Sequence, residues 1–239
     1  MSTRRQVLRA GITAAIGSWA ALELLGAGRA NAAPGPIITS TRISMVGDSL
    51  TLGTLPFQAA DLADAGWSHS SIDAYVSRGI RTKIRSDQHT GINAVDAIRA
   101  RSGDTDAWIV ALGTNDAVIY SREKQADVIR QMMDHIGYGH RVMWVNVYLP
   151  EARHLQSVWN SALAAAAGER AGAMFVYDWA SFAAENPRWL AHDHIHYSRD
   201  GYRYRSTAIG IASRDLLPAE SDSHLPPRWQ SQQAKSLPG

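Results

Sequence analysis

The chain has 239 residues, a formal net charge of +2 and no cysteine. Four of its 24 basic residues and one of its 22 acidic residues lie in residues 1–32, so the rest carries a net charge of −1. This balance excludes the basic surface of a nucleic-acid-binding protein. The lack of cysteine excludes disulfides, thiolate metal sites and a lipid-modified cysteine. The remainder is long enough for one domain with a sizeable core.

Residues 1–32 have the layout of an export signal. Arg4-Arg5 precede a moderately apolar stretch, Ala10–Ala27, and Ala30–Ala32 forms an A-x-A cleavage pattern. The segment resembles a twin-arginine signal peptide, which implies the twin-arginine export machinery as a partner. A transmembrane anchor is the alternative, but the stretch is short, weakly hydrophobic and contains Glu23. We therefore expect an extracellular or cell-envelope location, with no membrane span left after cleavage.

Apolar runs alternate with helical patterns along the next part of the chain. Helical periodicity appears around residues 92–98, 128–136 and 155–163, and a last helix is expected from about Asp200 to Leu217. The strand candidates are rich in Val and Ile, which is typical of a parallel sheet covered on both faces. They are Arg42–Val46, Ala107–Leu112, Val142–Leu149 and Met174–Tyr177, with a weaker alternating candidate at Ser71–Val76.

This alternation predicts an α/β fold, a three-layer α/β/α sandwich, in one domain spanning residues 33–217. Beyond Leu217 the composition turns to proline, serine and glutamine. Such a composition predicts an extended or disordered tail over residues 218–239.

Ligands of such folds bind beyond the carboxyl ends of the strands, and three of these positions carry suggestive residues. Ser49 leaves the first strand within Gly47–Leu50, where an α/β enzyme places a nucleophile, although Gly-Asp-Ser is also a common turn. Gly79 follows the weaker strand and can bring a backbone N–H to a substrate oxygen, or can simply form a turn. Asn115 follows the strongest strand as a side-chain donor or as a helix cap.

The fourth position is the histidine-rich segment just before the last helix. Asp193 stands three residues before His196, so a turn would let its carboxylate hold Nδ1–H and leave Nε2 for a nucleophile. His192, His194 and His196 also alternate, and on an extended segment they would suit zinc. No further acids or histidines accompany them, and a surface loop is a third interpretation. We expect neither a metal nor a cofactor.

Taken in order, the four blocks resemble those of the SGNH (GDSL-type) hydrolases. The resemblance extends from Ile43 to about Ile211. It implies a flavodoxin-like fold with a five-stranded parallel sheet. Two departures stand out, because a bulky Arg78 lies beside the glycine and His194 stands where family members often have a small residue.

The resemblance also implies roles for individual residues. Ser49 would be the nucleophile, His196 the base and Asp193 the acid that orients it. The oxyanion hole would consist of the backbone N–H groups of Ser49 and Gly79 and the side chain of Asn115. Serine needs such a base, and ester cleavage needs such donors, so the set fits catalysis through an acyl-serine intermediate.

We therefore expect an exported serine esterase that hydrolyses carboxylic esters, such as those of cell-envelope lipid or carbohydrate. The alternatives are an acyltransferase on a cell-wall glycan and a non-catalytic envelope-binding protein on the same scaffold. Trp179, Trp189 and Tyr197 lie near the histidine block and would line the substrate pocket or belong to the core. A core position is favoured for Trp179.

Overall fold

The computed structural model describes residues 41–83 and 89–217. The expected export signal and the expected tail, residues 1–32 and 218–239, lie outside the described residues. Within the described ranges, no helix is both long and apolar enough to cross a membrane.

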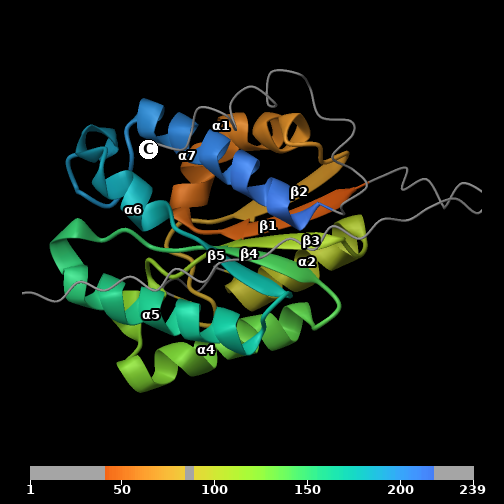
Figure 1. Ribbon diagram of the computed structural model, residues 1–239, viewed down its shortest axis with the longest axis horizontal. Coiled ribbons are helices and arrows are strands. Elements are labelled where there is room, and N and C mark those ends of the chain that lie inside the picture. The colour runs from red at the N-terminus through yellow and green to blue at the C-terminus, as the bar shows by residue number, and fades with distance from the viewer. Residues whose placement is uncertain (1–40, 84–88, 218–239) are drawn as a thin grey trace, which may run out of the picture. The chain divides into compact units, whose positions relative to one another are not determined.

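A five-stranded sheet forms the middle layer, and every strand pair in it is parallel (Figure 1). The strand order is β2-β1-β3-β4-β5. This arrangement confirms the predicted three-layer α/β fold with a five-stranded parallel sheet. The strands are β1 Arg42–Gly47, β2 His69–Ala74, β3 Ala107–Ala111, β4 Arg141–Val145 and β5 Met174–Tyr177.

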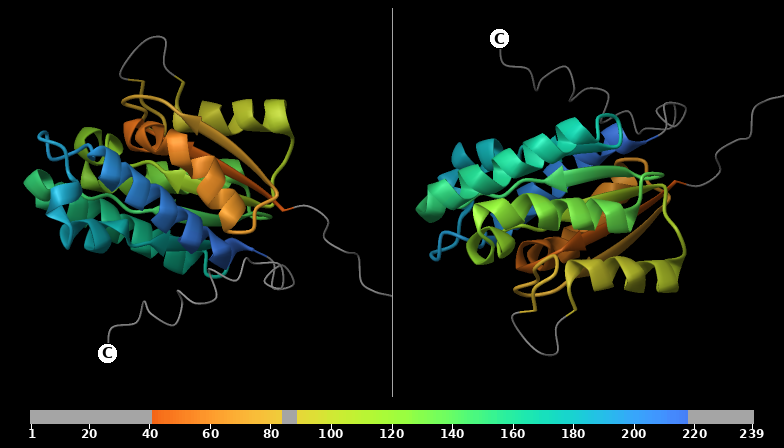
Figure 2. Two further views of the ribbon diagram at one scale, coloured as in Figure 1. Left: turned by 90° about the horizontal axis from the view of Figure 1, so that it is seen from above. Right: turned by 90° about the horizontal axis from the view of Figure 1, so that it is seen from below.

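Helices cover both faces of the sheet (Figures 1 and 2). The α-helices are α1 Ser49–Asp64, α2 Gly91–Ser102, α3 Asp116–Ile119, α4 Arg122–Ile136, α5 Arg153–Glu169, α6 Trp179–Ala184 and α7 Arg199–Ala212. The described part of the chain also contains the short 3₁₀ helices η1 Pro150–Ala152, η2 Pro187–Trp189 and η3 Ser213–Leu216.

Alternate residues of the central strands face two separate cores, as the two-residue period of a strand requires. In β3, Trp108 and Val110 pack on the side of α2, α4 and α5, whereas Ala107 and Ile109 pack on the side of α1 and α7. The core residues of β3 are fully buried on both faces. This explains why the strand sequence shows no polar alternation.

Two predicted strands differ from the structure by more than one residue at an end. The expected strand Val142–Leu149 ends at Val145, and the expected strand Ser71–Val76 begins and ends two residues earlier, at His69–Ala74. After β4, the Asn160 side chain accepts the Val147 N–H and donates to the Val147 carbonyl. It thereby makes the hydrogen bonds that a neighbouring strand would otherwise make. Val147 stays buried, so the apolar run continues where the strand does not.

The last helix also ends earlier than the sequence predicts. α7 stops at Ala212, and η3 follows it to Leu216. The buried Ser213 hydroxyl donates to the Gly210 carbonyl and accepts from the Trp67 indole N–H. These bonds anchor the chain where the helix tightens, because serine competes for backbone groups near helix ends.

The strand order places a topological switch point between β1 and β3. The chain runs from β1 outward to β2 and then returns to the other side of β1. Gly47 is in register with Ala74 of β2 and with Ala111 of β3, so three strand ends meet at one edge. Open α/β sheets bind ligands at such a place.

Candidate active site

Ser49 is the first residue of α1, directly beyond the end of β1. Asp48 caps the helix, since its carboxylate accepts the Leu50 N–H at 2.9 Å. A side chain on Gly47 would lie 1.9 Å from the Thr51 hydroxyl oxygen, so the tight strand-to-helix turn requires glycine. Because Ser49 is the first residue of α1, its hydroxyl lies at the positive end of the helix dipole, which favours negative charge there.

A chain of hydrogen bonds joins Ser49 to the histidine block across 147 positions of sequence. His196 Nε2 lies 3.0 Å from Ser49 Oγ, and His196 Nδ1 lies 2.7 Å from Asp193 Oδ2. The other Asp193 oxygen accepts the backbone N–H groups of Ile195 and His196 at 3.0 and 2.9 Å. The chain turns between the acid and the histidine as the sequence predicts.

The environment of Asp193 fixes the direction of these bonds. The hydrogen bond from the His196 ring, followed by the two backbone N–H groups, holds the pKa of Asp193 below its usual range. An ionised carboxylate only accepts, so Nδ1 of His196 donates to it. Nε2 of the neutral ring then accepts the Ser49 hydroxyl proton, which is the arrangement a general base needs.

Asn115 stands at the carboxyl end of β3, one residue before α3. Asn115 occupies the N-cap position of α3, as the alternative interpretation expected, but its side chain makes no capping hydrogen bond. Instead Nδ2 donates to the Arg78 carbonyl at 3.0 Å. A side-chain amide has two N–H groups, and the second remains for the cavity that Asn115 lines.

The residue of the loop after β2 that lines the cavity with Ser49 is Ser77, whereas Gly79 was expected. Ser77 lines the cavity there, with a left-handed φ of 53°. Gly79 is not among the lining residues in the described ranges, because it packs against the Asp116 carboxylate and the Thr82 carbonyl. Among the described residues, the cavity at the nucleophile is thus lined by Ser77 rather than by Gly79.

The cavity at Ser49 has a volume of about 410 Å³ and is mostly aliphatic. Its polar lining residues are Ser49, Ser77, Thr114, Asn115 and His196, and its apolar ones are Val76, Val118, Ile119, Leu149 and Ile195. Sequence reasoning missed all five aliphatic residues.

The aromatic residues considered for this pocket lie elsewhere. Trp179, Trp189 and Tyr197 are buried and pack together, with the Trp179 and Trp189 rings stacked at 6.1 Å. The Trp179 N–H donates to the Tyr197 hydroxyl at 2.7 Å. The prediction of a core position for Trp179 is thus confirmed.

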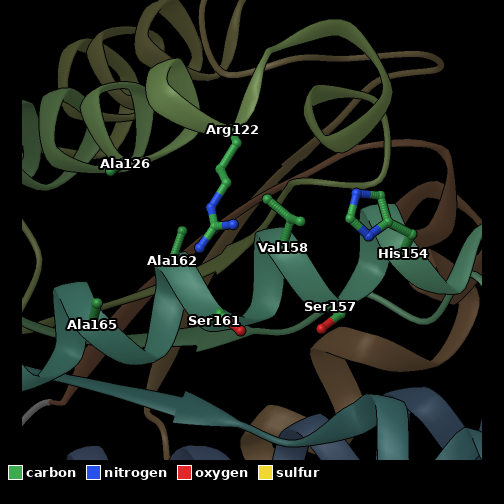
Figure 3. Close-up of a pocket in the computed structure, with 8 residues that line it drawn as sticks. All are labelled: Arg122, Ala126, His154, Ser157, Val158, Ser161, Ala162 and Ala165. Carbon is green, nitrogen blue, oxygen red and sulfur yellow. The ribbon is translucent and has the colours of Figure 1, made fainter.

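A second cavity of about 400 Å³ lies between α4 and α5 (Figure 3). Ser157 and Ser161 line it together with His154 and Arg122. No hydrogen bond joins either serine to His154 among the described residues, so this cavity holds no comparable serine–base pair. The remaining lining residues are Ala126, Val158, Ala162 and Ala165.

Two buried carboxyl groups lie close behind the nucleophile. Burial raises the pKa of Asp48 and raises that of Asp116 to about 7. The Ile80 N–H, which donates to Asp116 Oδ1 at 2.8 Å, opposes the shift, and the nearby Asp48 charge adds to it. Asp116 thereby connects the start of α3 to the segment after Ser77.

Two of the alternating histidines have different partners. His194 Nδ1 pairs with Glu151 at 2.8 Å, whereas His196 is engaged by Asp193 and Ser49. Within residues 41–83 and 89–217, no three potential ligands are grouped to hold a metal ion.

Comparisons with solved structures show the fold. The catalytic domain of Streptococcus pneumoniae peptidoglycan O-acetyltransferase A is 18% identical, covers 74% of this chain and 94% of its own, and has a TM-score of 0.55. The native M. smegmatis aryl esterase is 18% identical, covers 74% and 100%, and has a TM-score of 0.56. A carbohydrate acetylesterase from Sinorhizobium meliloti is 16% identical, covers 74% and 100%, and has a TM-score of 0.56.

No family model and no curated protein matches the sequence. The chain has the fold of the SGNH/GDSL hydrolases and esterases among these structures, at low sequence identity.

Proposed function

We propose that this chain is an exported serine esterase that hydrolyses carboxylic esters through an acyl-serine intermediate. The observation that carries the proposal is the hydrogen-bonded series from Ser49 through His196 to Asp193. Its distances of 3.0 and 2.7 Å suit proton transfer without rearrangement. The likeness in fold to esterases adds support.

In the proposed reaction, Ser49 Oγ attacks the ester carbonyl carbon while His196 Nε2 takes the hydroxyl proton. The C–O bond to the alcohol breaks, and the imidazolium returns its proton to the departing alkoxide. Water, deprotonated by the same histidine, then attacks the acyl carbon and releases the acid and the serine. Asp193 stays ionised throughout and stabilises the imidazolium.

The tetrahedral oxyanion would meet three donors. These are the backbone N–H groups of Ser49 and Ser77 and the free N–H of the Asn115 side chain. Ser77 replaces Gly79 in this role because Ser77 lines the cavity with the nucleophile. The loss of one such donor typically costs about 100- to 1000-fold in rate.

The aliphatic lining supports an apolar acyl group on the substrate. Val118 and Ile119 are the last two residues of α3 and line the same cavity as Asn115. They are 65% and 42% exposed, so a bound chain would remove a substantial apolar area from water. We infer that the acyl chain is longer than acetyl and contacts these two residues.

Acyl transfer is the second candidate, favoured by the likeness to the catalytic domain described as a peptidoglycan O-acetyltransferase. The same acyl-serine would then react with an acceptor hydroxyl in place of water. Adding chitooligosaccharides or other glycan acceptors to the esterase assay separates the two functions. An acylated acceptor, detected by mass spectrometry, would mark the transferase.

We propose export on the basis of the amino-terminal sequence. Arg4-Arg5, the apolar stretch and Ala30–Ala32 support a cleaved twin-arginine signal. A chain without cysteine needs no oxidative folding, which suits transport in the folded state.

The S49A variant tests the esterase. We expect it to lose p-nitrophenyl ester hydrolysis by at least about 10⁴-fold and to lose labelling by a fluorophosphonate probe. S157A, which changes the serine of the second cavity, is the matched control and should keep both. Parental hydrolysis by S49A would refute the proposal, and a folded parent that is never labelled would favour a non-catalytic binding protein.

A further inference from the structure

Arg78 has a buried guanidinium group with acceptors on three segments of the chain. It donates to the Asp73 carboxylate at 2.7 Å and to the Asp73 carbonyl at 2.8 Å. It also donates to the carbonyls of Gly47 at 3.2 Å and His89 at 3.1 Å. Its side chain is only 2% exposed. Arg78 thus ties the ends of β1 and β2 to the segment that leads into α2.

The same residue adjoins every donor of the oxyanion hole. Gly47, which its guanidinium holds, lies two positions before Ser49. Ser77 precedes it directly in the chain, and its own carbonyl oxygen accepts one N–H of Asn115 at 3.0 Å. Arg78 therefore holds the backbone two residues before Ser49, follows Ser77 directly in the chain and holds the Asn115 side chain through its carbonyl.

The backbone at Ser77 needs such support. A φ of 53° is unfavourable for a residue with a side chain, and such conformations persist only where the surroundings hold them. The guanidinium holds the loop to the sheet edge on one side of Ser77. On the other side, Gly79 accepts the Gly91 N–H and Ile80 donates to Asp116.

We propose that Arg78 is a positioning residue that sets the geometry of the oxyanion hole. This inference rests on the esterase proposed above. Arginine is required, because its planar fork reaches the Asp73 carboxylate and two carbonyls together, whereas lysine offers a single point of charge.

The expected signature is a loss in kcat with an unchanged KM. The oxyanion forms in the tetrahedral intermediate and in the transition states that flank it, and not in the bound substrate, so misplaced donors raise the barrier without weakening ground-state binding. A merely structural role would lower the amount of folded enzyme and leave the kcat of the folded fraction at the parental value.

The experiment compares R78K, N115A and the double variant R78K/N115A with the parent on one p-nitrophenyl ester. We expect kcat to fall about 10- to 100-fold in R78K, per folded molecule, with KM within about twofold of the parent. The loss in the double variant should be smaller than the product of the single losses, because R78K disturbs the loop whose carbonyl at position 78 holds Asn115, and N115A has already removed that donor. Thermal unfolding and circular dichroism give the folded fraction.

R101A is the matched control. Arg101 approaches the other oxygen of Asp73 at 3.8 Å but is 53% exposed and contacts none of the donors. It should keep the parental kcat. If R78K does not fold, D73N replaces it, since this variant weakens the same pair and keeps the arginine; we expect a threefold to tenfold loss in kcat.

A parental kcat in folded R78K, or in D73N where that variant is used, would overturn the inference. So would single losses that multiply in full in R78K/N115A, or in D73N/N115A. These results, together with an inactive S49A, would leave the proposed esterase intact. An active S49A would instead remove the proposed function itself.

Discussion

The φ angle of Ser77 bears on which backbone N–H, that of Ser77 or that of Gly79, can serve as an oxyanion donor. The sequence points to Gly79, because glycine is the residue that turns most easily. In the structure Gly79 has a packing role against Asp116, and Ser77 takes the left-handed conformation beside the nucleophile. The proposed chemistry does not need the Ser77 hydroxyl, since the backbone N–H would donate the hydrogen bond to the oxyanion.

We predict that S77G keeps kcat within about threefold, because it retains the N–H. Glycine at φ 53° has no side-chain strain, so the unfolding free energy should stay equal or rise by up to about 1 kcal/mol. S77V should lose about 1–3 kcal/mol, since a β-branched residue resists this angle. Urea unfolding and steady-state kinetics measure both effects. A 100-fold loss of kcat in S77G would assign the role to the hydroxyl.

Val118 provides a residue-scale test of the acyl group. We expect V118S to lower kcat/KM for an octanoyl ester about threefold to tenfold relative to an acetyl ester, because the serine offers less apolar surface to the chain. A p-nitrophenyl ester series from acetyl to dodecanoyl gives the profile. I211S changes an aliphatic residue of α7 that is 41% exposed, and it should leave the profile unchanged. An equal loss on all esters would contradict the acyl contact.

At the scale of elements, α3 is a single turn that joins two parts of the site. It presents Val118 and Ile119 to the cavity, and its first residue, Asp116, holds the Ile80 N–H. Strand β3, which precedes it, was predictable because its sequence, Ala107–Ala111, is a continuous apolar run. A four-residue helix has no such periodicity, so the sequence did not predict α3.

The D116N variant should change how stability depends on pH. Burial raises the pKa of Asp116 to about 7 in the folded state, above the unfolded value of 3.8. Between these values the folded chain binds a proton that the unfolded chain releases, so this group contributes stability at low pH that is lost as pH rises through 7. D116N lacks this dependence.

We therefore expect the parent's unfolding free energy, relative to that of D116N, to fall by a few kcal/mol between about pH 4 and pH 7. Urea unfolding at intervals of half a pH unit measures it. A difference that stays constant over this range would show that the carboxyl group is not buried as described.

At the scale of the whole molecule, the parallel sheet brings the separate parts of the site together. Ser49 and His196 are 147 positions apart and meet because the carboxyl ends of parallel strands share one edge. For the amino-terminal sequence, residues 1–32, we propose a role in transport.

We predict that replacing Arg4 and Arg5 together by lysine blocks export while leaving esterase activity in cell lysates at the parental level. The paired arginines are what the twin-arginine machinery reads. Immunoblots of culture medium, envelope and cytosol from a host with this pathway measure the distribution. Mass spectrometry of the exported protein should place its first residue at Ala33. Unchanged export of the double variant would contradict the signal.

The sequence by itself determined the fold class and the four polar blocks. Apolar runs, helical periodicity and turn residues such as Gly47 act over a few neighbouring positions, so they can be recognised without coordinates. Only the tertiary structure decided that Ser77 faces the cavity in place of Gly79, that Arg78 supports the loop, and that aliphatic residues surround the nucleophile. These features depend on backbone angles and on contacts among three strand ends, which no local pattern contains.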